Sequence, residues 1–276
     1  MKEAEIKKAV REGYAERVQN KSSCCAPAKS CCGGGNTARS ISKAIGYTEE
    51  EMDAVPDGAN LGLGCGNPIA LASLIAGETV LDLGSGAGFD CFLAAKRVGK
   101  SGKVIGVDMT PEMLEKAREN AEKGDYENVE FRLGEIENLP AADNSIDVII
   151  SNCVINLSPD KRRVFGEAFR VLKPGGRLMV SDIVLLKELP DFIRKSVAAY
   201  VGCISGAMMK NEYLRTIKEA GFKDVQVLDE AIFPIDCMAN DPTAKAIIKR
   251  VDLSEGEIKD TVNSVASIKV RGIKPK

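Results

Sequence analysis

The 276-residue chain contains no histidine and no tryptophan, and aromatic residues make up only 5% of it. Histidine is the commonest general base and a common metal ligand, so any chemistry here depends on cysteine, carboxylates, lysine, tyrosine or a cofactor. A charge excess is absent too, because 38 lysine and arginine residues are balanced by 40 aspartate and glutamate residues. Without a basic excess, nucleic acid is not expected as a partner.

Long hydrophobic runs are also lacking. No apolar stretch approaches the roughly 20 residues that a membrane-spanning helix needs, although apolar residues make up 44% of the chain and suffice for a core. The N-terminal sequence MKEAEIKKAVREGYAERVQ alternates charges and has no apolar signal-peptide core. We therefore expect a cytoplasmic, monomeric protein that does not act at a membrane.

Cysteine, by contrast, is abundant. The chain has nine, and in a reducing compartment they are expected to be ligands, redox groups or core residues rather than disulfides. Four of them lie in the sequence KSSCCAPAKSCCGGG, within a segment over 20–40 that we expect to be a flexible linker. A charged helix is expected before it, with one face formed by Ile6, Val10, Tyr14 and Val18. Residues 1–40 are therefore predicted to form a helix followed by a Cys-rich segment.

Strands and helices alternate from residue 79 onward. The pattern predicts a doubly wound, Rossmann-like α/β sheet with buried parallel strands. The expected strands are 79–84, 103–108, 129–134, 147–152 and 177–184, and the expected helices are 88–98, 110–123 and 160–172. We assign residues 41–205 to this domain and residues 206–276 to a smaller C-terminal α+β domain.

A glycine-rich loop follows the first of these strands. The sequence LDLGSGAG places Gly84, Gly86 and Gly88 between a strand and a helix, where glycine lets the backbone approach a ligand closely. Asp108 ends the next strand, 24 residues after Gly84, and a carboxylate at that place can accept both hydroxyls of a ribose. The loop and its acidic residue predict a nucleoside-containing cofactor.

The loop resembles motif I of the class I S-adenosylmethionine-dependent methyltransferases. Four further segments follow in that family's order: VDMTPEML, GEIENLP, SNCVINL and VLKPGGRL. The resemblance implies S-adenosylmethionine as the cofactor. It places Gly84, Ser85 and Gly86 at its methionine part, Asp108 at the ribose, Met109, Glu135 and Ile136 at the adenine, and Asn152 near the methionine end. Glu135 would accept a hydrogen bond from the adenine amino group.

Three cysteines outside the Cys-rich segment bear on the methyl acceptor. Cys153 follows a strand, and Cys65 and Cys203 lie in glycine-rich loops that can fold over the carboxyl edge of the sheet, where such folds bind ligands. Three converging thiolates select a soft, thiophilic centre. Zinc is one alternative, but its structural sites use four Cys or His ligands and CxxC-type spacing, which this sequence lacks. Trivalent arsenic prefers three sulfurs and keeps a nucleophilic lone pair.

At these cysteines the chain resembles the arsenite methyltransferases. The segments GCGNP, SNCVINLSPDK and GCISGA match three motifs of that family, and the likeness covers about residues 41–235. It implies that Cys65, Cys153 and Cys203 bind arsenic, presented as arsenite or a thiol conjugate. It also implies that an N-terminal cysteine exchanges disulfides with them, and that a glutathione- or thioredoxin-like reductant takes part.

The family's single N-terminal cysteine has four counterparts here: Cys24, Cys25, Cys31 and Cys32. We expect the exchange at Cys31 or Cys32, while a tail whose cysteines have no role stays an alternative. Cys91 is expected to be a small buried hydrophobic residue, and no role is assigned to Cys91 or Cys237. Two other functions stay open, a methyltransferase acting on a quinone- or sterol-like acceptor and a non-catalytic arsenic or metal sensor, because fold and cofactor do not fix the acceptor.

Overall fold

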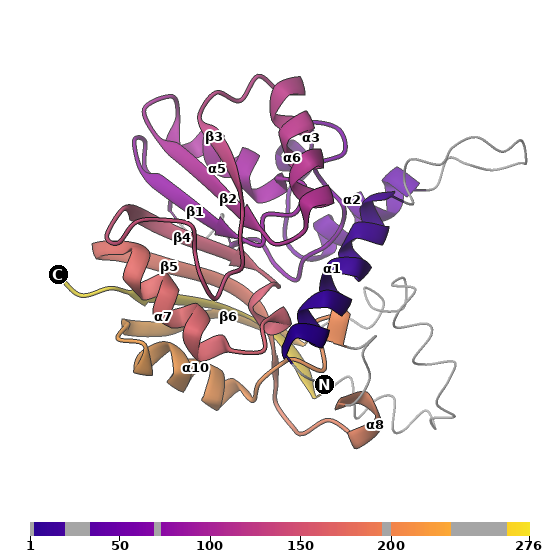
Figure 1. Ribbon diagram of the computed structural model, residues 1–276, viewed down its shortest axis with the longest axis vertical. Coiled ribbons are helices and arrows are strands. Elements are labelled where there is room, and N and C mark those ends of the chain that lie inside the picture. Colours follow the sequence, from indigo (N-terminus) through magenta and orange to yellow (C-terminus); the bar gives the residue numbers. More distant parts are fainter. Residues whose placement is uncertain (1–2, 20–33, 69–72, 195–199, 233–263) are drawn as a thin grey trace, which may run out of the picture.

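A single seven-stranded sheet organises the molecule in a computed structural model that describes residues 3–19, 34–68, 73–194, 200–232 and 264–276 (Figure 1). The strand order is β3-β2-β1-β4-β5-β7-β6. The strands are β1 (Thr79–Leu83), β2 (Lys103–Asp108), β3 (Val129–Leu133), β4 (Ile146–Asn152), β5 (Leu172–Leu185), β6 (Lys223–Ile232) and β7 (Val265–Ile273). The first five are mutually parallel, whereas β7 runs antiparallel to both β5 and β6.

Helices cover both faces of this sheet, and alternate residues of each strand point to opposite faces. Val80 packs with α5 (Phe89–Val98) and α6 (Pro111–Lys123) in one core cluster. Its neighbour Leu81 packs in a second cluster with α7 (Lys161–Val171) and α10 (Lys210–Glu219). The predicted doubly wound α/β fold is confirmed.

The C-terminal strand is the main feature that the strand pattern did not predict. β7 inserts between β5 and β6, with Val180 opposite Val270 and Val227 opposite the same residue on the other side. The described part of residues 206–276 therefore extends the sheet. The division of the chain into three parts stays a prediction.

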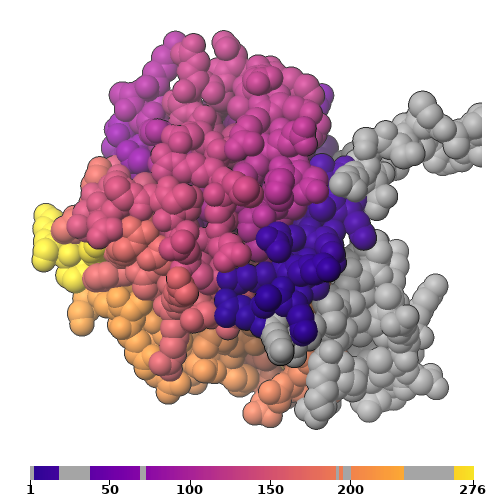
Figure 2. All heavy atoms as spheres, in the orientation of Figure 1, coloured from indigo at the N-terminus to yellow at the C-terminus, as the bar shows by residue number. Residues whose placement is uncertain are grey.

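The N-terminal helices lie against one edge of the α/β layer. The expected helix over 1–19 is present as α1 (Glu3–Gln19), and α3 (Glu49–Asp53) begins with a capping box formed by Thr48 and Glu51. The prediction of a linker over 20–40 is wrong at its C-terminal end, because α2 (Gly34–Ala44) begins at residue 34. The glycines at the start of α2 disfavour a helix prediction, but the segment is amphipathic and buries Ala38. Figure 2 shows α1, in indigo, lying across the surface of the magenta and pink part of the chain.

Three short helical segments complete the description: η1 (Ile155–Leu157) after β4, α8 (Asp191–Arg194) after β5, and a helical turn before Cys203. Among the helices that the structure describes, none is long and apolar enough to cross a membrane.

Candidate active site

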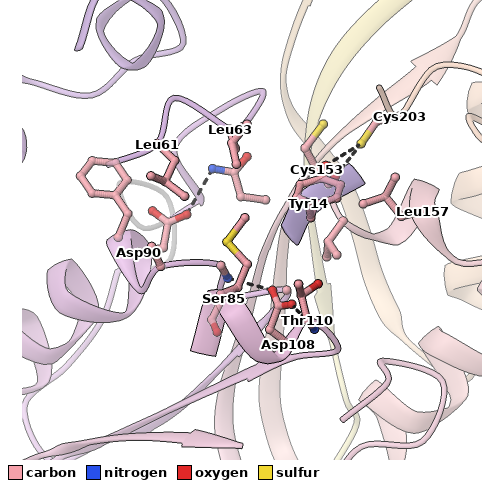
Figure 3. A pocket seen from close by; sticks show the side chains of 18 of the residues that line it. Tyr14, Leu61, Leu63, Ser85, Asp90, Asp108, Thr110, Cys153, Leu157 and Cys203 are labelled. Carbon is pink, nitrogen blue, oxygen red and sulfur yellow. Dashed lines mark hydrogen bonds between the residues drawn. The ribbon is translucent and has the colours of Figure 1, made fainter. Parts of the chain in front are cut away.

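A cavity of about 210 Å³ lies at the carboxyl ends of the parallel strands (Figure 3). Ligands bind at this edge in doubly wound sheets because the strand order reverses there and the loops diverge. Residues from β1, β2 and β4 and from α1 form its wall. The predicted residues that line it are Gly84, Ser85, Gly86, Asp108, Met109, Ile136, Asn152, Cys153 and Cys203.

The glycine loop forms a backbone cradle on this wall. Gly84 and Gly86 have φ values of 68° and 52°, in the left-handed region that favours glycine. A Cβ at Gly84 would overlap the Val154 side chain. Between the two glycines the buried Ser85 Oγ has no hydrogen-bond partner among the described residues, and a buried polar atom of this kind fits a wall that meets a polar ligand.

Asp108 presents its carboxyl group at the end of β2. Its oxygens accept hydrogen bonds from the backbone N–H groups of Gly86, at 2.9 Å, and Thr110, at 2.8 Å. Burial raises the pKa of this carboxyl, and the two N–H donors oppose the shift. The side chain is therefore fixed between the glycine loop and the start of α6, where it can face ribose hydroxyls.

Helix α1 lines another part of the cavity, through Lys7, Val10, Tyr14 and Arg17. Ile136 also lines the cavity and is 8% exposed. Glu135, expected to accept from adenine, instead pairs with Lys7 of α1 at 2.7 Å, and Lys7 also lies 3.4 Å from Glu137. The predicted Glu135 is thus not among the residues that line the cavity, and it lies in an ion pair that the sequence did not indicate.

Asn152 connects this cavity with the loop that carries Cys65. Its Oδ1 accepts from the Cys65 backbone N–H at 3.0 Å, and its Nδ2 lies 2.8 Å from the Gly66 carbonyl and 3.2 Å from Asp90 Oδ2. Tyr47 donates to Asp90 Oδ1 at 2.6 Å and accepts from Asn152. Burial raises the pKa of Asp90 to about 6. One amide thus fixes both a carboxylate on the cavity wall and the Cys65 loop.

The structure brings Cys65, Cys153 and Cys203 into one cluster. All three are free thiols; Cys65 and Cys203 are each 4% exposed. The Cys203 thiol donates to the Cys153 carbonyl at 2.9 Å. The sulfurs of Cys65 and Cys153 lie, with a carboxylate oxygen of Asp182, within 4.8 Å of one another. Three sulfurs from three separate loops therefore meet beside the cavity.

The surroundings of Cys65 and Cys153 favour the protonated form of these two thiols. Burial raises the pKa of Cys65, and contacts with the sulfurs of Cys203 and Cys65 raise the pKa of Cys153. Cys153 and Cys203 also have φ values of 59° and 65°, a strained conformation for a residue with a side chain, which persists where the fold imposes it. The Cys65 loop is pinned too, because Ser267 of β7 donates to the Cys65 carbonyl at 2.7 Å.

Asp182 lies beside the thiol cluster, although it is not among the site residues that the sequence predicts. It follows β5 residue Ser181 and is fully buried, with hydrogen bonds from Asn156, Ile183 N–H and Tyr213 at 2.9, 2.9 and 3.0 Å. Burial raises the pKa of its carboxyl to about 7. An acidic residue in the apolar run RLMVSDIV was the available signal.

Two groups of residues remain: predicted residues that the structure does not describe, and site residues that the sequence did not indicate. Cys31 and Cys32, with Cys24, Cys25 and Cys237, lie outside the residues that the structure describes. Site residues that the sequence did not indicate come from segments read only as helix, strand or loop: Lys7, Tyr14, Tyr47, Asp90 and Asp182. The sequence places Tyr14 on an apolar helix face and Asp90 within the helix expected over 88–98, and neither pattern marks a site residue.

Comparison with known proteins gives the following matches. A methyltransferase domain family matches residues 74–221. An arsenite methyltransferase of Halobacterium salinarum is 51% identical over 81% of this chain and 59% of the relative, and one of Homo sapiens is 36% identical over 80% and 59%. The crystal structure of CrArsM, an arsenic(III) S-adenosylmethionine methyltransferase from Chlamydomonas reinhardtii, matches with a TM-score of 0.61 and 34% identity, covering 91% of this chain and 75% of that one. The chain thus spans little more than half the length of the curated relatives it matches.

Proposed function

The chain belongs to the arsenite methyltransferase family of S-adenosylmethionine-dependent methyltransferases, and from that premise we propose that it methylates trivalent arsenic bound by Cys65, Cys153 and Cys203. One observation carries the proposal. Three free thiols from separate loops converge beside a cavity whose other wall is a glycine cradle with a fixed carboxylate. A methyltransferase of an oxygen or carbon acceptor has no use for such a cluster.

The cofactor is S-adenosylmethionine, and the residues on the cavity wall fit it. The Ser85 Oγ, which has no hydrogen-bond partner in the described part of the chain, and the open backbone at Gly84 and Gly86 suit the methionine part. Asp108 would accept the ribose hydroxyls, while Met109 and Ile136 would pack against the adenine. Asp90 and Asn152 would face the cationic methionine end. When bound, the cofactor supplies a methyl group on a positively charged sulfur and leaves as S-adenosylhomocysteine.

The thiol cluster would capture arsenic by ligand exchange. Each cysteine sulfur forms one bond to arsenic as a hydroxide or small thiolate leaves, and the cysteine proton goes to that leaving group as water or free thiol. Protonated thiols therefore suffice, in agreement with the raised pKa values of Cys65 and Cys153. The arsenic lone pair then points to the cofactor edge of the cavity, and no general base is needed because the lone pair carries no proton.

Positioning supplies most of the acceleration in this proposal. An already reactive nucleophile needs to be held close to and in line with the methyl group, and orientation of this kind is worth several kcal/mol, on the order of 7–11, in model reactions. The imposed φ values of Cys153 and Cys203 and the pinned Cys65 loop are what hold the three sulfurs.

Methyl transfer oxidises arsenic by two electrons, so the cycle includes a reduction. Two thiols can supply those electrons by forming a disulfide, which a glutathione- or thioredoxin-like reductant then reopens. Cys31 and Cys32 are the candidates from the sequence for exchange with the thiol cluster. Arsenite, its thiol conjugates and this reductant are the proposed partners.

The decisive experiment measures methylated arsenic and S-adenosylhomocysteine formed from arsenite, glutathione and S-adenosylmethionine. We expect Cys153→Ser and Cys203→Ser to lower turnover roughly 100-fold or more, because a misplaced acceptor loses that much. Cys91→Ser is the matched control, since Cys91 is buried on α5 and bonds Asp82 through an S–H group that a hydroxyl can replace. Full arsenite methylation by Cys153→Ser would disprove the thiol site. Cofactor binding without an arsenic product would point to an organic acceptor, or to a sensor if no acceptor is methylated.

A further inference from the structure

A tyrosine from the N-terminal helix reaches the thiol cluster. The Tyr14 hydroxyl lies 4.0 Å from Cys203 Sγ, although 189 positions separate the two residues in sequence. Figure 3 shows Tyr14 beside Cys153 and Cys203, on the side of the cavity away from Asp90. The same helix lines the cavity with Lys7 and Val10. A segment outside the α/β sheet therefore contributes to the wall of the proposed arsenic site.

Packing fixes this tyrosine rather than leaving it as a loose surface side chain. Val10, one turn earlier on the same face, is 1% exposed, and Lys7, a turn before that, pairs with Glu135. Gly13 allows a close approach, because a Cβ there would lie only 2.9 Å from Val201 Cγ1. Consecutive residues of α1 thus contact residues 201 and 203 of one turn.

The bonding of Cys203 changes in kind when its sulfur binds arsenic. In the free thiol the S–H group donates to the Cys153 carbonyl at 2.9 Å. A sulfur bound to arsenic has given up that proton and can only accept, and a carbonyl oxygen can only accept as well. The contact with Cys153 is then lost, whereas the Tyr14 hydroxyl can donate. Cys203 needs such a partner because its φ of 65° is unfavourable for a side-chain-bearing residue.

We propose that Tyr14 is a positioning residue of the arsenic site, whose hydroxyl donates a hydrogen bond to the Cys203 sulfur in the arsenic-bound state. This role rests on the proposed function. The hydrogen bond keeps Cys203 in the ligand set and turns its sulfur toward Cys65 and Cys153. Tyr14 acts through Cys203 and takes no part in methyl transfer itself.

The test compares Tyr14→Phe, which removes only the hydroxyl, with Tyr126→Phe. Tyr126 is a matched control because its hydroxyl bonds the Ala54 carbonyl on another part of the molecule. Arsenite binding to the full chain is followed by the ultraviolet absorption of arsenic–sulfur bonds, and S-adenosylmethionine binding by calorimetry. We expect Tyr14→Phe to weaken arsenite binding roughly twofold to tenfold and to shift the absorption, as for loss of one hydrogen bond between neutral groups. Cofactor affinity should stay within about twofold, and Tyr126→Phe should change neither.

A double-mutant cycle separates this role from general damage to the site. In a Cys203→Ser background the acceptor sulfur is gone, so adding Tyr14→Phe should have no further effect on arsenite binding. An equal loss in both backgrounds, or wild-type arsenite binding and absorption in Tyr14→Phe, would overturn the proposal. If the wild-type protein itself binds no arsenite, the proposed function fails; if it binds and Tyr14→Phe binds equally well, only the role of Tyr14 fails.

Discussion

Asp182 is a single residue whose protonation couples the fold to pH. Its fully buried carboxyl has a pKa of about 7, against about 3.9 in an unfolded chain. Proton binding therefore stabilises the folded state fully below about pH 4, and this stabilisation is lost as the pH rises through 7. Asp182→Asn removes the titration. We expect the free energy of unfolding of this variant, relative to wild type, to increase by about 2–3 kcal/mol between pH 5 and pH 8.

Urea unfolding of the arsenic-free protein at both pH values measures this change. Any constant effect of the amide on its neighbours cancels in the comparison. Asp229→Asn serves as a control, because the ion pair with Lys269 at 3.0 Å lowers the pKa of that exposed carboxyl. Asp229 is then ionised in the folded and the unfolded protein at both pH values, so the difference between this variant and wild type should hardly change from pH 5 to pH 8. A difference between Asp182→Asn and wild type that does not vary with pH would mean that Asp182 is ionised in the folded protein throughout.

Helix α1 is the element outside the sheet that lines the cavity. It rests on the buried Val10 and on the ion pair of Lys7, whereas the sheet beneath has its own two core clusters. Val10→Ala should weaken docking by on the order of 2 kcal/mol through the cavity it leaves. Amide hydrogen exchange in residues 3–19 should then rise roughly 30-fold, with weaker cofactor binding. Exchange in β1 and β4 should hardly change.

Arg11→Ala, one residue further on the exposed face of the same helix, controls for helix propensity. Mass-spectrometric hydrogen exchange on both variants distinguishes weaker docking of α1 from a change in its helix propensity. If residues 3–19 exchange equally fast in Val10→Ala and Arg11→Ala, the burial of Val10 contributes little to the docking of α1.

The helices and strands show how much of this structure could be predicted from the sequence. The parallel strands and their carboxyl-edge loops were predictable, because buried parallel strands are continuous apolar runs and their ends lie together. Cys153, Asp108 and the glycine cradle follow from that rule. The position of α1 over the cavity does not, because an amphipathic helix shows which face is buried but not its partner. The bridge between Tyr14 and Cys203 is for the same reason absent from the sequence pattern.

The strand order at the C-terminus was unpredictable for a related reason. Pairing between β5 and β7 joins residues about 90 positions apart, and nothing local in VASIKVRGI selects its neighbours. The left-handed backbone at Cys153 and Cys203 was likewise hidden, since no glycine or asparagine marks it.

At the scale of the whole molecule, the insertion of β7 should make folding a single cooperative event. β7 pairs with both β5 and β6, and Ser267 on it bonds the Cys65 loop. The last strand in the sequence is thus part of the sheet that carries the cofactor cavity. We expect far-ultraviolet circular dichroism and the fluorescence of the five tyrosines to report one coincident unfolding transition.

Two isoleucine variants test this cooperativity. Ile268→Ala empties a fully buried position on β7 and should lower the free energy of unfolding by about 2–5 kcal/mol. Both probes should then shift together. Ile232→Ala, on β6 where the side chain is 48% exposed, should change it by less than about 0.5 kcal/mol. If Ile268→Ala instead splits the transition in two, residues 206–276 unfold as a separate domain and the three-part division of the chain holds. A single shifted transition means that β7 unfolds together with the sheet that carries the thiol cluster.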